Sequence, residues 1–141
     1  MTDTTITATT ARATGKLNDL VLAGFRIVVS FLFACHGAQG FGLLGGIDGQ
    51  GTAVPFGVWP GWWASVIELV GALLVLVGLF PRIAALLCSG AMAYAYFVVH
   101  QPEALLPLHN MGEPAALYAW AFLLIAVLGP GAFTVERAFR R

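Results

Sequence analysis

The chain has 141 residues, which is the size of one domain. Its composition is 59% hydrophobic and 10% charged, and its mean hydropathy of +0.85 is above that of ordinary soluble domains. The formal net charge is zero, so the composition gives no electrostatic support for a nucleic-acid partner. Membrane-spanning helices are therefore the first expectation.

Residues 1–19 differ from the rest of the chain. They include seven threonines and very few bulky apolar side chains. We expect a flexible cytoplasmic tail, or at most a helix start that frays. A secretory signal peptide is not expected, because the polar region is long and no small-residue cleavage site follows the next apolar run.

Four long apolar runs follow, at 20–39, 61–80, 82–101 and 114–133. Each has about the 20 residues that cross a hydrocarbon core as a helix. None shows strand-like alternation, and a helix satisfies its own backbone in lipid. Pro81 and Arg82 leave almost no loop between the second and third runs, so these two form a hairpin. The sequence predicts an all-α integral membrane protein, an antiparallel four-helix bundle formed by a domain of residues 20–136.

The basic residues orient the predicted bundle. They lie before or within the first run, in the turn between the second and third runs, or after the last run: Arg12, Lys16, Arg26, Arg82, Arg137, Arg140 and Arg141. The two other loops contain no Lys or Arg, so the positive-inside rule places both termini in the cytoplasm and those loops outside. Residues 137–141 then form a basic cytoplasmic tail. We expect a multi-pass protein of the bacterial plasma membrane, in contact with the lipid bilayer.

The position of two ionisable residues inside the apolar runs requires an explanation, because a charge within a membrane span costs free energy. Arg26 lies roughly 9 Å from the inner edge. It either snorkels to the inner headgroups or holds a carboxylate or an anionic ligand. Glu68 lies roughly 10 Å below the outer end, and small residues on its helix face predict that it points into the bundle. It has either a functional role or a structural hydrogen bond. A direct Arg26–Glu68 pair stays open, since their depths differ by roughly 10 Å.

The other polar side chains of interest gather at the outer end of the predicted bundle. They are His36, Gln39, Tyr96, His100, His109, Asn110 and Glu113. Asn110 and Glu113 also have the spacing of a cap on the fourth helix, with Glu113 in the capping-box position. No metal motif such as H-E-x-x-H is present, so metal binding is not expected. A quinone-type ligand fits such a mixture of aromatic and proton-carrying groups.

Nothing in the sequence is itself an electron carrier. There is no haem-ligand pair, no iron–sulfur spacing and no nucleotide fingerprint. Cys35 and Cys88 form no C-x-x-C motif, and we expect both to be small apolar packing residues. Any electrons would therefore come from a bound quinone or from a partner protein.

Several short motifs, in their order and spacing, resemble those of the DoxX family of small four-span bacterial membrane proteins. They are "FACHG" (33–37), "IEL" with Glu68, "GLFPR" (78–82), "AYFVVH" (95–100), "NMGE" (110–113) and "GPGAFTVE" (129–136). The resemblance covers about residues 20–136. Pro81 stands where the family pattern has threonine, while Thr134 and Glu136 stand where serine and aspartate are more usual.

The resemblance implies a membrane subunit associated with sulfur-compound oxidation linked to the quinone pool. The polar positions of the family would fall on Arg26, His36, Glu68, His100, Asn110 and Glu113. On this hypothesis the catalytic residues are Glu68, which handles protons, and His36 and His100, which bind or relay. The ligand-binding residues are Arg26, Tyr96, His109, Asn110 and Glu113.

Two alternatives from other classes stay open. The first is a non-catalytic membrane scaffold that binds soluble redox enzymes through its basic cytoplasmic segments. The second is a small-solute carrier, which with only four spans would require a homodimer. The scaffold predicts that the basic segments matter and that the outer polar residues do not.

Overall fold

The computed structural model describes residues 2–139, with side chains from residue 13 onward. Its helices are α1 (Thr2–Gly40), α2 (Gly61–Val77), α3 (Pro81–Tyr94), the π-helix η1 (Ala95–His100), α4 (Glu113–Leu128) and α5 (Val135–Phe139). No strand forms within residues 2–139, where Gly46 and Thr52 make only an isolated bridge. The predicted all-α class is confirmed for this part of the chain.

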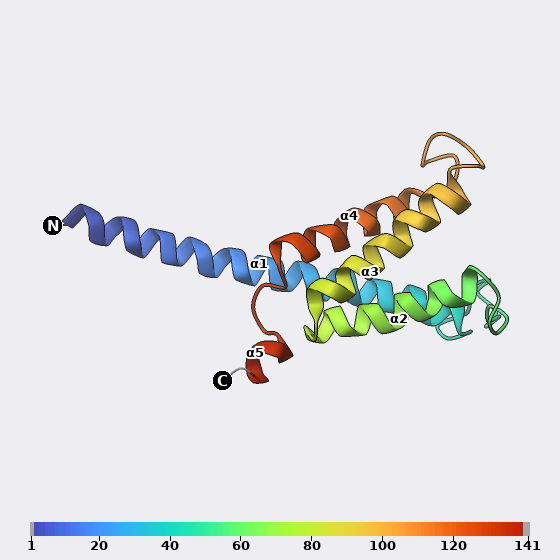
Figure 1. The fold of residues 1–141 in the computed structure, drawn as a ribbon, viewed down its shortest axis with the longest axis horizontal. Helices are drawn as coiled ribbons and strands as arrows, with labels where there is room; N and C mark the ends of the chain where they lie inside the picture. Colours follow the sequence, from blue (N-terminus) through green and yellow to red (C-terminus); the bar gives the residue numbers. More distant parts are fainter. Residues whose placement is uncertain (1, 140–141) are drawn as a thin grey trace.

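The four long helices run back and forth, as Figure 1 shows. Loops 41–60 and 101–112 lie at one end, which we name the loop end. The α2–α3 turn, residues 129–134 and α5 lie at the other, which we name the hairpin end. α2 packs against α1 and α3, and α3 packs against α4, whereas α1 and α4 touch much less.

In the part of the chain that the structure describes, two helical segments are long and apolar enough to cross a membrane: Ala13–Gly40 of α1, and Pro81–His100, which joins α3 and η1. α2 and α4 are shorter than their predicted runs, with 17 and 16 residues. Each is therefore only about 24–26 Å long. Gly78, in the left-handed conformation, ends α2, and Gly129 followed by a proline ends α4.

Residues 2–19 continue the helix of the first apolar run without a break, in place of the flexible tail that their composition predicts. No proline and only one glycine, Gly15, interrupts this stretch, so a helix that has formed in the apolar run can propagate through it. This part of α1 projects beyond the other helices in Figure 1. Of the predicted basic tail, Arg137 belongs to α5, whereas Arg140 and Arg141 lie outside the described residues.

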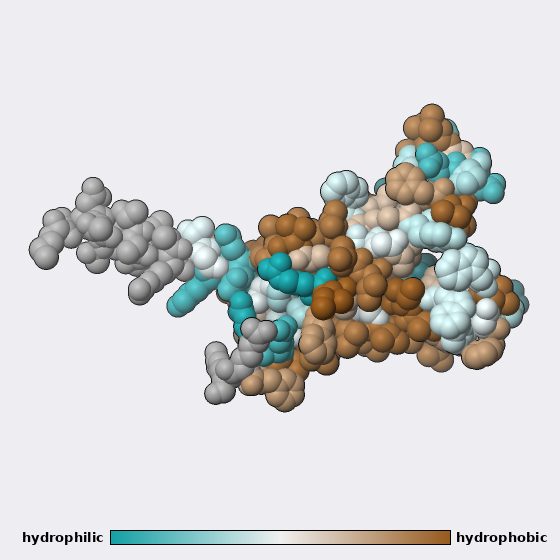
Figure 2. All heavy atoms as spheres, in the orientation of Figure 1, coloured by the Kyte–Doolittle hydropathy of each residue, from teal (hydrophilic) through white to brown (hydrophobic). Residues whose placement is uncertain are grey.

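The core between the helices is thin. Its largest fully buried apolar side chains are Phe33, Val75, Cys88, Phe122 and Ile125. Most other large apolar side chains of the helices point outward. Figure 2 shows the resulting hydrophobic surface over the packed helices. An apolar surface of this extent is typical of helices that face lipid.

Glycines allow α1 and α2 to approach closely at the loop end. A Cβ atom at Gly37 would lie 2.6 Å from the backbone nitrogen of Leu69 and 2.9 Å from the Cβ of Glu68. On the α3 side of α2, a Cβ at Gly71 would lie 2.5 Å from the Cys88 sulfur. Small residues therefore pack α2 tightly between α1 and α3 around Glu68, as the sequence predicts.

Candidate functional site

Glu68 is the buried carboxyl group of the protein's loop-end half. Its side chain lies on α2 and is only 7% exposed. Its carboxyl group makes no hydrogen bond and no ion pair with another described residue, but its oxygens keep some solvent contact, since Ser30 Oγ is the described buried side-chain atom that lacks a partner. Placing an ionisable group this deep between helices costs free energy. A group kept at that cost is a candidate for a chemical role.

Ionisable side chains from the three other helices interact electrostatically with Glu68. His36 on α1, Cys88 on α3 and Tyr118 on α4 all lie within electrostatic range of its carboxyl. Cys35 on α1 is within the same range of Tyr118. Cys88 is buried, Cys35 and Tyr118 are half-buried, and His36 is exposed. The Glu68 cluster, meaning these five residues, therefore extends from the core to the surface.

A groove runs between α1 and α4 beside this cluster. It has a volume of about 390 Å³ and is lined by Val29, Leu32, Glu113, Pro114, Leu117, Tyr118 and Ala121. We name it the α1–α4 groove. His36 follows Leu32 by one turn on the same face of α1, so it continues this wall toward the loop end. Tyr118 lines the groove and lies within electrostatic range of Glu68, and its ring centroid lies 4.8 Å from that of Phe33.

Arg26 is fully buried and faces neither headgroups nor a carboxylate. Its guanidinium donates five hydrogen bonds of 2.6–3.2 Å to the backbone carbonyls of Val75, Leu76, Pro130, Ala132 and Phe133. The last carbonyls of α2 have no donor within their own helix, which is why a cation is favourable there.

The structure thus gives Arg26 a structural role that neither sequence interpretation included. Its N–H groups are occupied by backbone oxygens, which leaves none for an anionic ligand, and no ion pair joins it to Glu68. Arg82 has a similar role in the second helix pair. Its guanidinium donates two bonds of 2.9 Å to the Ala126 and Val127 carbonyls near the end of α4. The two arginines thus complete the hairpin ends of α2 and α4.

His100 and Asn110 together build loop 101–112. The Nδ1 atom of His100 lies 2.9 Å from the backbone oxygen of Asn110. A carbonyl only accepts, so Nδ1 carries the proton and the Nε2 lone pair of a neutral ring is left for another partner. The Asn110 side chain is buried, donates to the Ala104 carbonyl (2.7 Å) and accepts from the Gly112 amide (2.8 Å).

The capping box predicted for the fourth helix is wrong. α4 begins at Glu113 after Gly112, and no side chain caps this end. Asn110 instead forms a turn with the Gly112 amide, two residues on. Gly112 packs so closely that a Cβ there would lie 2.8 Å from the Cβ of His100 and 3.0 Å from the Tyr96 ring. This contact fixes the turn before the helix and leaves Glu113 exposed at the first helical position.

The sequence-predicted residues thus fall into separate places. His36, Glu68 and Glu113 lie at or beside the α1–α4 groove, whereas His100 and Asn110 organise loop 101–112. Tyr96 lines a different groove, between α3 and α4. His109 is exposed. Tyr118 was not among the site residues predicted from the sequence, and Cys35 was expected to be a packing residue; the position of Cys35 directly before His36 was the available signal.

The described residues contain no group of three or more His, Cys, Asp or Glu side chains that could hold a metal ion. The side chains around Glu68 instead include one thiol in the core, one half-buried thiol, one phenol and one imidazole. Such groups can exchange protons with a bound molecule and donate hydrogen bonds to it.

Comparison with known proteins identifies the family. The DoxX family model matches residues 21–101. An uncharacterized protein of Haemophilus influenzae is 36% identical over 132 residues, covering 88% of this chain and 94% of the relative. The inner membrane protein YqjF of Escherichia coli is 29% identical over 130 residues, covering 89% and 97%. No solved structure matches. The chain is therefore a membrane protein of the DoxX family.

Proposed function

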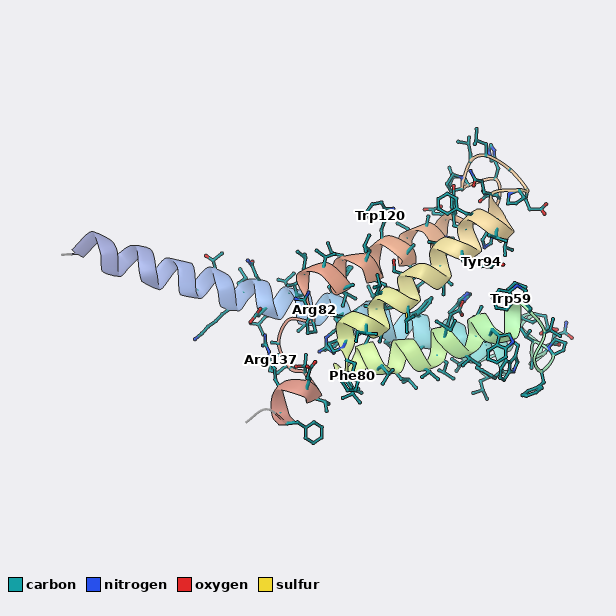
Figure 3. All side chains as sticks on the ribbon, viewed as in Figure 1. Trp59, Phe80, Arg82, Tyr94, Trp120 and Arg137 are labelled. Atoms are coloured by element: carbon teal, nitrogen blue, oxygen red, sulfur yellow. The ribbon has the colours of Figure 1, made fainter. Side chains whose placement is uncertain are left out.

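We propose that the chain crosses the bacterial plasma membrane four times, as an antiparallel four-helix bundle with both termini in the cytoplasm. Two features support this topology. Loops 41–60 and 101–112 contain no Lys or Arg, whereas Arg82 and Arg137 lie at the hairpin end (Figure 3). The similar protein of Escherichia coli is named an inner membrane protein. The loop end is then the outer end, and the short α2 and α4 match a locally thin bilayer.

In this orientation the Glu68 cluster is a polar pocket near the outer face, and its function is in quinone-linked or thiol/sulfur redox chemistry. The observation that supports the proposal is the Glu68 carboxyl, which is 7% exposed, makes no hydrogen bond to another described residue and lies within electrostatic range of His36 and Tyr118. Reduction of a quinone to a quinol consumes two electrons and two protons. Glu68 and His36 would pass the protons, while a reduced sulfur compound or a soluble partner enzyme supplies the electrons.

The test is purification in mild detergent, followed by mass spectrometry of extracted small molecules and an assay of quinone reduction by reduced sulfur compounds. We expect a co-purifying quinone. We also expect Glu68→Gln to lower turnover at least about tenfold, since one acid–base group contributes about 10²–10⁴-fold. Glu103→Gln, in the exposed loop, is the matched control and keeps full activity. Full activity in both Glu68→Gln and His36→Ala, with no bound molecule, would rule the pocket out.

A scaffold for soluble redox enzymes is the second candidate, and the hairpin end favours it. Phe80, Phe133 and Phe139 are 61%, 75% and 83% exposed there, next to exposed arginines. The Arg137 side chain forms an ion pair of 3.8 Å with Asp19, in which both side chains are exposed, and such a pair is worth little energetically. If charge reversal at Arg137 abolished activity while Glu68→Gln left it intact, the function would lie at this surface instead.

A further inference from the structure

We propose that the α1–α4 groove is a lateral access site. Through it, a membrane-soluble amphiphile with a hydrogen-bonding ring and an apolar tail reaches the Glu68 cluster from within the bilayer. The inference rests on the membrane orientation proposed above and specifies how the pocket is loaded. It concerns binding alone, so it can fail or hold independently of the redox role.

The packing of the helices leaves this position open. α1 and α4 make far fewer contacts than the α1–α2 and α3–α4 pairs. The groove volume of about 390 Å³ lies within the range of small-molecule sites, roughly 300–1,000 Å³. Its lips face outward, since Leu32 is 51% and Leu117 is 63% exposed. In the proposed orientation this opening faces lipid tails rather than water.

The lining of the groove changes from apolar to polar toward the loop end. Val29 and Ala121 lie nearer the hairpin end, while Glu113 and, one turn beyond Leu32, His36 lie at the loop end. An amphiphile would place its tail along the apolar part and its ring beside the carboxylate and the imidazole. The groove between α3 and α4 and the groove between α2 and α3 have no carboxylate and no histidine in their linings.

Tyr118 connects this groove with the buried carboxyl. Its side chain is part of the lining of the groove and is within electrostatic range of Glu68 and Cys35. Contacts with Phe33 (4.8 Å between ring centroids) and Phe122 (6.3 Å) hold the ring in place. A ring bound at the loop end of the groove would therefore contact Tyr118, a side chain within electrostatic range of Glu68.

Loop 101–112, next to the mouth of the groove, has apolar side chains suited to the outer leaflet of the bilayer. Leu105, Leu108 and Met111, just before α4, are 79%, 73% and 79% exposed. Apolar side chains of this size are stable in the acyl and headgroup boundary and costly in water. Access from the bilayer is thus favoured over access from the aqueous phase.

The test uses the full chain in phosphatidylcholine nanodiscs and two photoreactive probes. One is an azidobenzoquinone with a decyl tail, and the other is a decyl diazirine without a ring. Mass spectrometry maps the labelled peptides. We expect the quinone probe to label peptides of residues 29–36 and 113–121, and the diazirine to label lipid-facing helices without this preference. Equal labelling of these peptides by the diazirine would mean that ordinary lipid tails fill the groove, and would overturn the proposal.

Matched variants test the position. Ala121→Trp fills the groove and should lower labelling by the quinone probe at least tenfold. Leu117→Trp, at an exposed position, blocks the mouth of the groove. This variant replaces Ala121→Trp in the test if Ala121→Trp does not fold. Ala116→Trp, in the groove between α3 and α4, should leave labelling unchanged. Unchanged labelling in both groove variants, or labelling centred on α2 and α3, would overturn the site. Glu68→Gln should still be labelled, which separates ligand access from proton transfer.

Discussion

Arg26→Lys tests whether the fork of the guanidinium, rather than its charge, holds the hairpin end together. Lysine keeps the positive charge but has three N–H donors, so at least two of the five carbonyl bonds observed for Arg26 are lost. A hydrogen bond to a charged group contributes about 1.5–3 kcal/mol. Two such losses predict a decrease of about 3–6 kcal/mol in the free energy of unfolding, because the freed carbonyls stay between the helices.

The assay is equilibrium unfolding by sodium dodecyl sulfate in mixed micelles, followed by circular dichroism. Arg82→Lys is the matched control. Arg82 is exposed and donates two hydrogen bonds to backbone carbonyls, both of which a lysine can replace. Arg82→Lys should therefore lower the free energy of unfolding by less than about 1 kcal/mol. If Arg26→Lys has the same free energy of unfolding as the wild type, the hydrogen bonds from Arg26 to the five backbone carbonyls do not stabilise the fold. A stable Arg26→Lys variant that has lost ligand binding would restore Arg26 to the site.

Three further outcomes follow from local contacts. Gly37→Ala places a Cβ against the α2 backbone and should cost about 1–3 kcal/mol in the same unfolding assay, whereas Gly24→Ala, with nothing within 4 Å, should not destabilise. Glu68→Gln should change the free energy of unfolding by less than about 1 kcal/mol, because no described partner is lost, and a larger loss would reveal a structural role.

The third outcome concerns Asp48. The hydroxyl of Thr52 and two backbone amides lower the pKa of this carboxyl below its ordinary value. The bonds of Asp48 therefore contribute to loop order above the unfolded pKa, and that contribution is lost as pH falls through the folded pKa. The rate of hydrogen exchange at the Thr52 amide is measured in the wild type and in Asp48→Asn at each pH. The two rates should differ at neutral pH and become equal in acid. A constant difference would contradict this assignment.

The helix class follows from the sequence, while the helix ends do not. Continuous apolar runs without alternation indicate helices, and all four runs contain one. The ends depend on where the backbone can turn. Gly78 adopts the left-handed conformation and ends α2 before its apolar run is finished. The turn at Asn110 depends on Gly112 packing against His100 in three dimensions, which no local capping pattern reveals.

The site could be predicted only as a collection of residues at one end. Helix periodicity and small neighbours placed Glu68 inside the bundle correctly. The role of Arg26 was missed because its partners lie 49 to 107 residues away, on α2 and on residues 130–133. Sequence spacing likewise does not show that α1 and α4 pack loosely, which is the reason Tyr118 and Glu113 share a groove with Leu32.

The central claim is that Glu68 exchanges a proton with a molecule bound beside Tyr118. Infrared difference spectroscopy on the protein loaded with a decyl-tailed benzoquinone, recorded between its oxidised and reduced states, measures this directly. The account predicts a carboxyl carbonyl band in the difference spectrum that shifts in Glu68→Asp and is absent in Glu68→Gln. An identical band in wild type and Glu68→Gln, or no carboxyl band although the quinone is reduced, would contradict it.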